Sequence, residues 1–207
     1  MLHDINLAAI LAAALIASCS PGPATLAIAG TSLERGRAAG LALASGITTG
    51  SLIWSVAAAA GLGALMHTHA WTLEVVRYVG AAYLMFLAFK SARAAIGGRA
   101  IATRSFTGSR RRLYLRGLAL HLTNPKAILF FGALYSIAIP AGTPASALVV
   151  VILAVFTQSL LIFHGWALLF SVPVMTRSYL RLRRGFEAAF ALGFGALGLR
   201  ILTARFT

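Results

Sequence analysis

One lysine lies in the middle of a long apolar stretch, where a charged side chain is costly. Lys126 falls midway along residues 113–139. A lysine at the centre of a membrane helix costs at least about 2.5–3.5 kcal/mol on insertion scales, and such residues face the protein interior with a partner. We expect no carboxylate at this depth, because all four acidic residues fall near the ends of apolar stretches: Asp4, Glu34, Glu74 and Glu187. Lys126 is therefore expected to bind backbone carbonyls, water or an anionic group of a bound molecule.

Helix-breaking residues interrupt two of the apolar stretches near their middles. The breaks are residues 20–23 (Ser-Pro-Gly-Pro) and 124–126 (Asn-Pro-Lys). Proline removes a backbone N–H group and clashes with the carbonyl four residues before it, so each break leaves acceptors without donors. In a bilayer such backbone is tolerated only where protein surrounds it or where it lines a watery cavity. The alternative is that each proline only kinks its helix. We predict that the break residues line a substrate-binding site: Pro21, Gly22, Pro23, Asn124, Pro125 and Lys126.

Polar residues inside two further apolar stretches extend this predicted site. Thr48 and Ser51 lie near the middle of the second stretch, and Thr157 and Gln158 lie near the middle of the fifth. Buried polar side chains in membrane helices usually face the bundle interior or a cavity. We expect these four side chains to line the same cavity as the breaks.

Two histidines join Lys126 as candidates for coupling transport to an ion gradient. His121 lies in the fourth apolar stretch, and His164 lies in the fifth. Histidine changes its charge near physiological pH, which suits a proton relay. The alternative for each histidine is a hydrogen-bonded packing role.

The composition places the chain in a membrane. Hydrophobic residues make up 59% of the 207 residues and charged residues 11%, and the mean hydropathy is +0.87. A soluble core of this size cannot bury so much apolar surface, and a hydrocarbon layer about 30 Å thick needs helices of about 20 residues. The sequence predicts an all-α membrane protein with six transmembrane helices, at residues 5–29, 38–65, 73–92, 113–139, 145–172 and 186–202.

The basic residues are distributed unevenly between the two sides of this predicted bundle. Fourteen of the 18 lysines and arginines lie on alternate connections: after the first stretch, around the connection from the third to the fourth, and before the sixth. The positive-inside rule makes this side cytoplasmic and puts both termini outside. The run of arginines in residues 104–112 is expected to contact anionic lipid rather than nucleic acid, although the net charge is +14.

The six predicted spans form two similar groups of three. The halves are residues 1–95 and 113–207, joined by a basic linker at residues 96–112, and together they make one domain. Each half opens with a proline-broken span, and the two broken spans enter the membrane from opposite sides. This is the pattern of an inverted repeat, in which broken helices meet near the bilayer midplane.

The sequence offers little support for other classes of protein. It contains no metal-ligand cluster, nucleophile motif or phosphate-binding loop, so we expect no metal, no cofactor and no enzymatic activity. Residues 16–19 look like a lipoprotein cleavage site, but no basic residue precedes them, and we treat them as part of the first span. Two rivals to a transporter remain: a membrane-embedded enzyme that uses Lys126 and the histidines, and a non-transporting scaffold.

Several motifs together resemble the LysE/RhtB family of bacterial amino-acid exporters. They occur in order between about residues 20 and 131, at residues 21–23, 32–41, 80–84 with Lys90, 116–117 and 124–127. The resemblance implies an exporter of amino acids or related metabolites in the bacterial inner membrane, driven by an ion gradient. It also implies a homodimer.

Two positions depart from the family pattern. Ala24 stands where members commonly carry Asn after Pro-Gly-Pro, and Ser51 stands where many carry Asp. An acid at position 51 would suit an ammonium group or proton coupling. Its absence predicts a neutral or acidic substrate rather than a cationic amino acid.

Overall fold

The described part of the chain folds into helices alone. The structure is a computed structural model that describes residues 5–66, 70–97, 103–140 and 142–203. These residues form α1 (Leu7–Cys19), α2 (Pro23–Arg35), α3 (Arg37–Met66), α4 (Ala70–Ile96), α5 (Arg110–Leu122), α6 (Pro125–Ala138), α7 (Ala145–Leu169) and α8 (Pro173–Thr203). The all-α prediction is confirmed for this part of the chain.

Half of the six predicted spans are continuous helices that are long and apolar enough to cross a membrane. Among the described residues, these segments are Arg37–Gly61 in α3, Tyr78–Ile96 in α4 and Ala145–Leu169 in α7. The pair α1 and α2 makes a fourth such segment if it is taken as one bent span. The other two predicted spans overlap α5 plus α6 and the C-terminal part of α8, and their crossing of the membrane stays a prediction.

Both predicted helix breaks are present. α1 ends at Cys19 and α2 begins at Pro23, with a bend of 53° between their axes. α5 ends at Leu122 and α6 begins at Pro125, where the Asn124 side chain caps the new helix. The backbone N–H groups in the first turn of a helix have no partner within the helix. A proline at the first position therefore costs no hydrogen bond, and each of these prolines is tolerated where it starts a helix.

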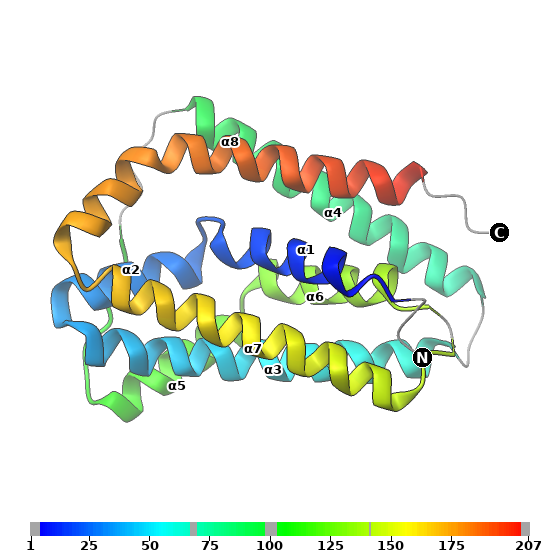
Figure 1. Ribbon diagram of the computed structural model, residues 1–207, viewed down its shortest axis with the longest axis horizontal. Helices are drawn as coiled ribbons and strands as arrows, with labels where there is room; N and C mark the ends of the chain where they lie inside the picture. Colours follow the sequence, from blue (N-terminus) through cyan, green and yellow to red (C-terminus); the bar gives the residue numbers. More distant parts are fainter. Residues whose placement is uncertain (1–4, 67–69, 98–102, 141, 204–207) are drawn as a thin grey trace.

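Three of the four helices that flank the breaks lie in the centre of the molecule. In Figure 1, α4 and α8 form one layer and α3, α5 and α7 form the opposite layer, with α1, α2 and α6 between them. Successive segments run back and forth along the long axis, and α1 begins at the same end at which α8 finishes (Figure 1). This arrangement places both breaks between the two layers, with Ser20 and Asn124 buried.

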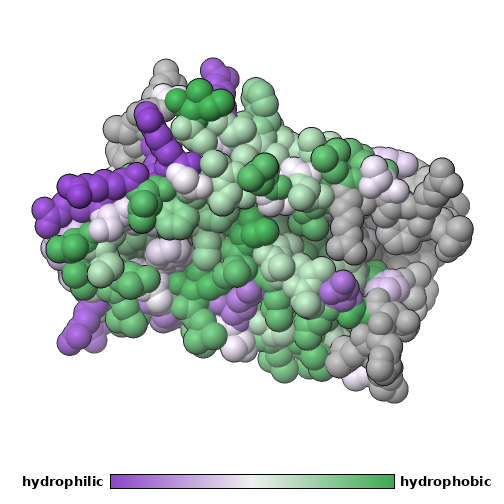
Figure 2. All heavy atoms as spheres, turned by 45° about the horizontal axis from the view of Figure 1, so that its top comes forward, coloured by the Kyte–Doolittle hydropathy of each residue, from purple (hydrophilic) through white to green (hydrophobic). Residues whose placement is uncertain are grey.

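Basic residues gather at one end of the molecule. The C-terminus of α2 and the N-termini of α3, α5 and α8 all lie at the left in Figure 1. On the face shown in Figure 2, most of the hydrophilic side chains lie at this same end, and apolar side chains cover the middle. The segment before α5 crosses α2 here, where the Phe106 backbone N–H donates to Thr31 Oγ1 at 3.1 Å.

Glycines allow α3 and α5 to pack closely. A Cβ atom on Gly46 would lie 2.7 Å from the backbone nitrogen of Leu118, and one on Gly117 would clash with the Leu43 carbonyl. Lipid provides no hydrophobic drive between helices, so such backbone contact must hold them together. The position of Gly61, also on α3, has open space around it.

Gly46→Ala should destabilise the protein in detergent, whereas Gly61→Ala should not. Overpacking a tight contact costs about 1–3 kcal/mol, while alanine in place of an unhindered helical glycine removes a propensity cost of about 1 kcal/mol. Thermal unfolding of the purified variants measures the difference. Equal midpoints for the two variants would contradict the close α3–α5 contact.

Candidate functional site at the helix breaks

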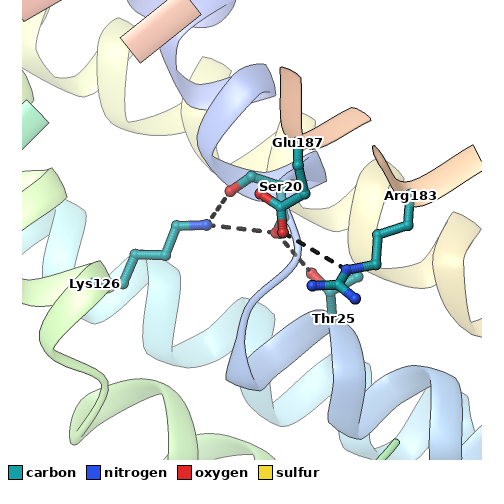
Figure 3. Close-up of polar contacts among 5 residues, drawn as sticks. All are labelled: Ser20, Thr25, Lys126, Arg183 and Glu187. Atoms are coloured by element: carbon teal, nitrogen blue, oxygen red, sulfur yellow. Dashed lines mark hydrogen bonds and ion pairs between the residues drawn. The ribbon is translucent and has the colours of Figure 1, made fainter. Parts of the chain in front are cut away.

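The two breaks meet at Lys126. Its Nζ donates a hydrogen bond to the Ala17 carbonyl at 2.9 Å and one to the Ser20 carbonyl at 3.4 Å, and it also bonds Ser20 Oγ (Figure 3). Helical bonding would pair the Ala17 carbonyl with the N–H of residue 21, but residue 21 is proline. Lys126 and the Ser20 hydroxyl, which donates to the same carbonyl at 3.1 Å, together replace the donor that the proline removed. Backbone carbonyls were among the partners expected for Lys126, and this expectation is confirmed.

The second break presents the lysine from the start of α6. Asn124 is 6% exposed, and its Oδ1 accepts from the Lys126 backbone N–H at 3.1 Å. Side-chain caps of this kind satisfy one of the donors that a helix start leaves open. The cap fixes the direction of the first turn of α6, and Lys126 is the second residue of that turn.

A cavity of about 640 Å³ opens beside Lys126. Its volume lies within the range typical of sites for small molecules. Residues of α4 and α8 complete its wall, among them Lys90, Glu187 and Phe194. All six predicted break residues line it: Pro21, Gly22, Pro23, Asn124, Pro125 and Lys126.

The cavity contains a carboxylate that the sequence analysis missed. Glu187 is only 5% exposed, and its Oε1 lies 4.0 Å from Arg183 Nε on the preceding turn (Figure 3). The expectation that no acid lies at the depth of Lys126 is wrong. α8 begins at Pro173 rather than at residue 186, so Glu187 lies in the middle of a long helix. The spacing of Arg183 and Glu187, four residues apart as helical pairs are, was the available signal.

A second, smaller cavity of about 50 Å³ lies against the first break and Lys126. Ser51 lines it and shares a 3.0 Å hydrogen bond with Ser159 of α7. His121 also lines it, is 5% exposed and packs edge-on against the Phe163 ring at 5.9 Å. Neither ring nitrogen of His121 is hydrogen-bonded to a residue in the described part of the chain.

Three residues predicted to line the cavity lie outside both cavities. Thr48 is buried but lines neither, and Thr157 is exposed. The Gln158 Nε2 group donates to the Leu11 carbonyl at 2.9 Å instead. The α7 hydroxyl that reaches the small cavity is Ser159, because it shares a helix face with residues 155 and 163 while Thr157 points away from that face.

His164 lies apart from Lys126. Its Nε2 is 3.0 Å from Ser45 Oγ, and its Nδ1 is 2.9 Å from the Leu160 carbonyl. One ring nitrogen thus contacts α3 and the other contacts its own helix, contacts that fit the hydrogen-bonded packing alternative, while a coupling role for His164 stays a prediction.

The chain is similar to known efflux proteins over most of its length. The sequence profile of the LysE type translocators matches residues 15–205. The threonine efflux protein of Escherichia coli (strain K12) is 30% identical over 187 residues, which cover 87% of this chain and 91% of that protein, and the threonine efflux protein of Salmonella typhi aligns to the same extent. The homoserine/homoserine lactone efflux protein of Salmonella typhimurium (strain LT2) is 36% identical over 127 residues, 61% of each chain.

No solved structure matches the chain. The resemblance seen in the motifs between residues 20 and 131 is confirmed and extends to residue 205. The protein belongs to the LysE type translocator family.

Proposed function

We propose that this protein exports neutral amino acids or closely related metabolites across the bacterial inner membrane. Lys126 carries the proposal, because its ammonium group joins the two helix breaks at the wall of a cavity of about 640 Å³. The names of the relatives support an amino-acid substrate, since they describe efflux of threonine and of homoserine or its lactone. Family membership favours export over a membrane-embedded enzyme or a passive scaffold.

The substrate carboxylate binds Lys126. An anion that enters the cavity can replace the neutral acceptors Ala17 and Ser20 with a charged one, and charge-assisted hydrogen bonds are stronger than neutral ones. The start of α2 assists, because Gly22 makes no side-chain cap bond to its first turn. Helix N-termini of this kind attract anions. When Lys126 leaves the Ala17 and Ser20 carbonyls, the contact between the two breaks is also weakened. Substrate binding would in this way be linked to movement of the helices.

The transporter works as six spans in two inverted halves, residues 1–95 and 113–207, within one domain. The bent pair of α1 and α2 and the separate helices α5 and α6 support this view, since each half begins with a segment that is broken at a proline, and both breaks lie between the two layers. Rocking of one half against the other would expose the cavity to each side in turn. An ion gradient drives this cycle, with Lys126 and His121 as the titratable groups that line the small cavity beside the first break. Two copies form the dimer that the family resemblance implies.

The basic end of the molecule is the cytoplasmic one in this proposal, and both termini are outside. The positive-inside rule supports this orientation, as does the gathering of hydrophilic side chains at one end (Figure 2). Residues 1–4 and 204–207 lie outside the described residues.

Single cysteines placed at Ser109 and Thr143 should react with an impermeant thiol reagent from opposite sides of the membrane. The background is Cys19→Ser, which removes the only native cysteine. Thr143→Cys should be labelled in intact cells and Ser109→Cys only after permeabilisation, because position 109 follows the basic linker. Labelling of both positions in intact cells would contradict the orientation.

Lys126→Met should lower export by at least about tenfold while the protein stays in the membrane at near-normal abundance. Hydrogen bonds to charged groups contribute about 1.5–3 kcal/mol, and removal of a buried charge lowers the cost of insertion. The control is Arg110→Met, which also removes a cation, because Arg110 is exposed and lines neither cavity. Uptake into inverted vesicles measures export. Near-wild-type uptake by Lys126→Met would refute the site.

Inverted vesicles should accumulate threonine or homoserine in a gradient-dependent manner, and lysine much more weakly. Cations predominate in the cavity, where Lys90, Lys126 and Arg183 face the single carboxylate of Glu187 among the lining residues. A further cation is repelled in such a low-dielectric site. Lysine uptake equal to threonine uptake would show the substrate preference to be wrong, and gradient-independent turnover would favour the enzyme alternative.

A further inference from the structure

Glu187 and Lys126 bring opposite charges to one cavity from two different helices. Lys126 enters from the start of α6, and Glu187 enters from the middle of α8. Both side chains are labelled in Figure 3, where they approach the first break from different sides. Within the described part of the chain, no direct ion pair joins them.

The face of α8 that carries Glu187 is turned toward Lys126. Phe194 follows Glu187 by seven residues, which places the two on the same side of the helix. The Phe194 ring centroid lies 5.9 Å from Lys126 Nζ. Glu187, Phe194 and Lys126 therefore line the same cavity.

A buried carboxylate needs a cation close by. Removing a charge from water costs several kcal/mol unless it is well paired, and Glu187 is only 5% exposed. Its ion pair with Arg183 has a separation of 4.0 Å, longer than the 2.7–2.9 Å of a charge-assisted hydrogen bond. The carboxylate thus lies at a cavity wall without a close contact to that partner, and it can accept a second cation.

We propose that Glu187 binds the α-ammonium group of the substrate while Lys126 binds its carboxylate. This inference rests on the proposed export of amino acids and deepens it, because it makes the substrate class zwitterionic α-amino acids. An α-amino acid carries its ammonium group and its carboxylate on the same carbon atom, and the cavity presents one partner for each. Organic acids without an ammonium group satisfy only Lys126, and they leave the Glu187 carboxylate without its cation.

Three ligands separate the two contacts. L-Threonine carries both charges, N-acetyl-L-threonine lacks the ammonium, and L-threonine methyl ester lacks the carboxylate. The experiment measures binding of each to the purified full-length protein in detergent by isothermal titration calorimetry. The cavity of about 640 Å³ has room for the added groups, so a loss of affinity reports the lost charge.

The wild-type protein should bind threonine at least about tenfold more tightly than N-acetyl-L-threonine, since loss of one partner of a buried charge pair is costly. Glu187→Gln should bind these two ligands about equally, yet still prefer threonine to its methyl ester. Lys126→Met should bind threonine and its methyl ester about equally, yet still prefer threonine to N-acetyl-L-threonine. The matched control is Glu34→Gln, an exposed glutamate on α2, which should keep both preferences.

A purely structural Glu187 would give a different result. If it served only the Arg183 pair, Glu187→Gln would weaken all three ligands by the same factor and keep the preference for threonine over its N-acetyl form. That result overturns the inference but leaves the proposed export intact. Equal binding of threonine and N-acetyl-L-threonine by the wild-type protein also overturns it, even if Glu187→Gln does not fold. Wild-type protein that binds none of the ligands and exports no amino acid overturns both proposals.

Discussion

The structure depends on a carbonyl that has lost its donor. Pro21 has no N–H to offer the Ala17 carbonyl, and Lys126 supplies the bond from another helix. In an apolar environment an unbonded carbonyl and an unpaired ammonium group are both costly. The Ser20 hydroxyl also donates to this carbonyl at 3.1 Å, whereas the Lys126 ammonium group finds both of its carbonyl acceptors at the first break, so its burial is favourable when the two helix breaks lie side by side. This contact fixes the first break against the second.

The rest of the fold follows from the need to enclose that contact. Irregular backbone at membrane depth must be surrounded by protein or line a cavity, and α1, α2 and α6 accordingly lie between the layers formed by α4 with α8 and by α3, α5 and α7 (Figure 1). Tight packing in the second layer relies on glycine, as at Gly46 and Gly117. The α4–α8 layer leaves a cavity beside the breaks, and its charged residues give that cavity its chemistry.

The helix breaks and the inward position of Lys126 could be predicted from the sequence, because nearby residues determine them. Which polar side chains reach a cavity could not be predicted, because that depends on how each helix is rotated in the bundle. Prolines mark both breaks directly, and the depth of Lys126 in an apolar stretch predicts that it turns inward to a carbonyl. Thr157 and Ser159 are equally polar, however, and only the packed face of α7 decides that Ser159 reaches the cavity. Glu187 was missed because apolar length alone placed the start of the last helix too late. How many segments cross the membrane depends on α5, α6 and α8, because α5 and α6 have only 13 and 14 residues and because α5 and the first half of α8 carry several charges.

The contact between the Lys126 ammonium and a substrate carboxylate can be measured directly, because the chain has only two lysines. Solid-state NMR on protein with ¹⁵N-labelled lysine side chains and bound threonine labelled with ¹³C at its carboxylate reports the dipolar coupling between the two nuclei. We expect a coupling typical of hydrogen-bond contact that persists in Lys90→Met. Bound threonine that shows no coupling to either lysine would contradict the central role of Lys126.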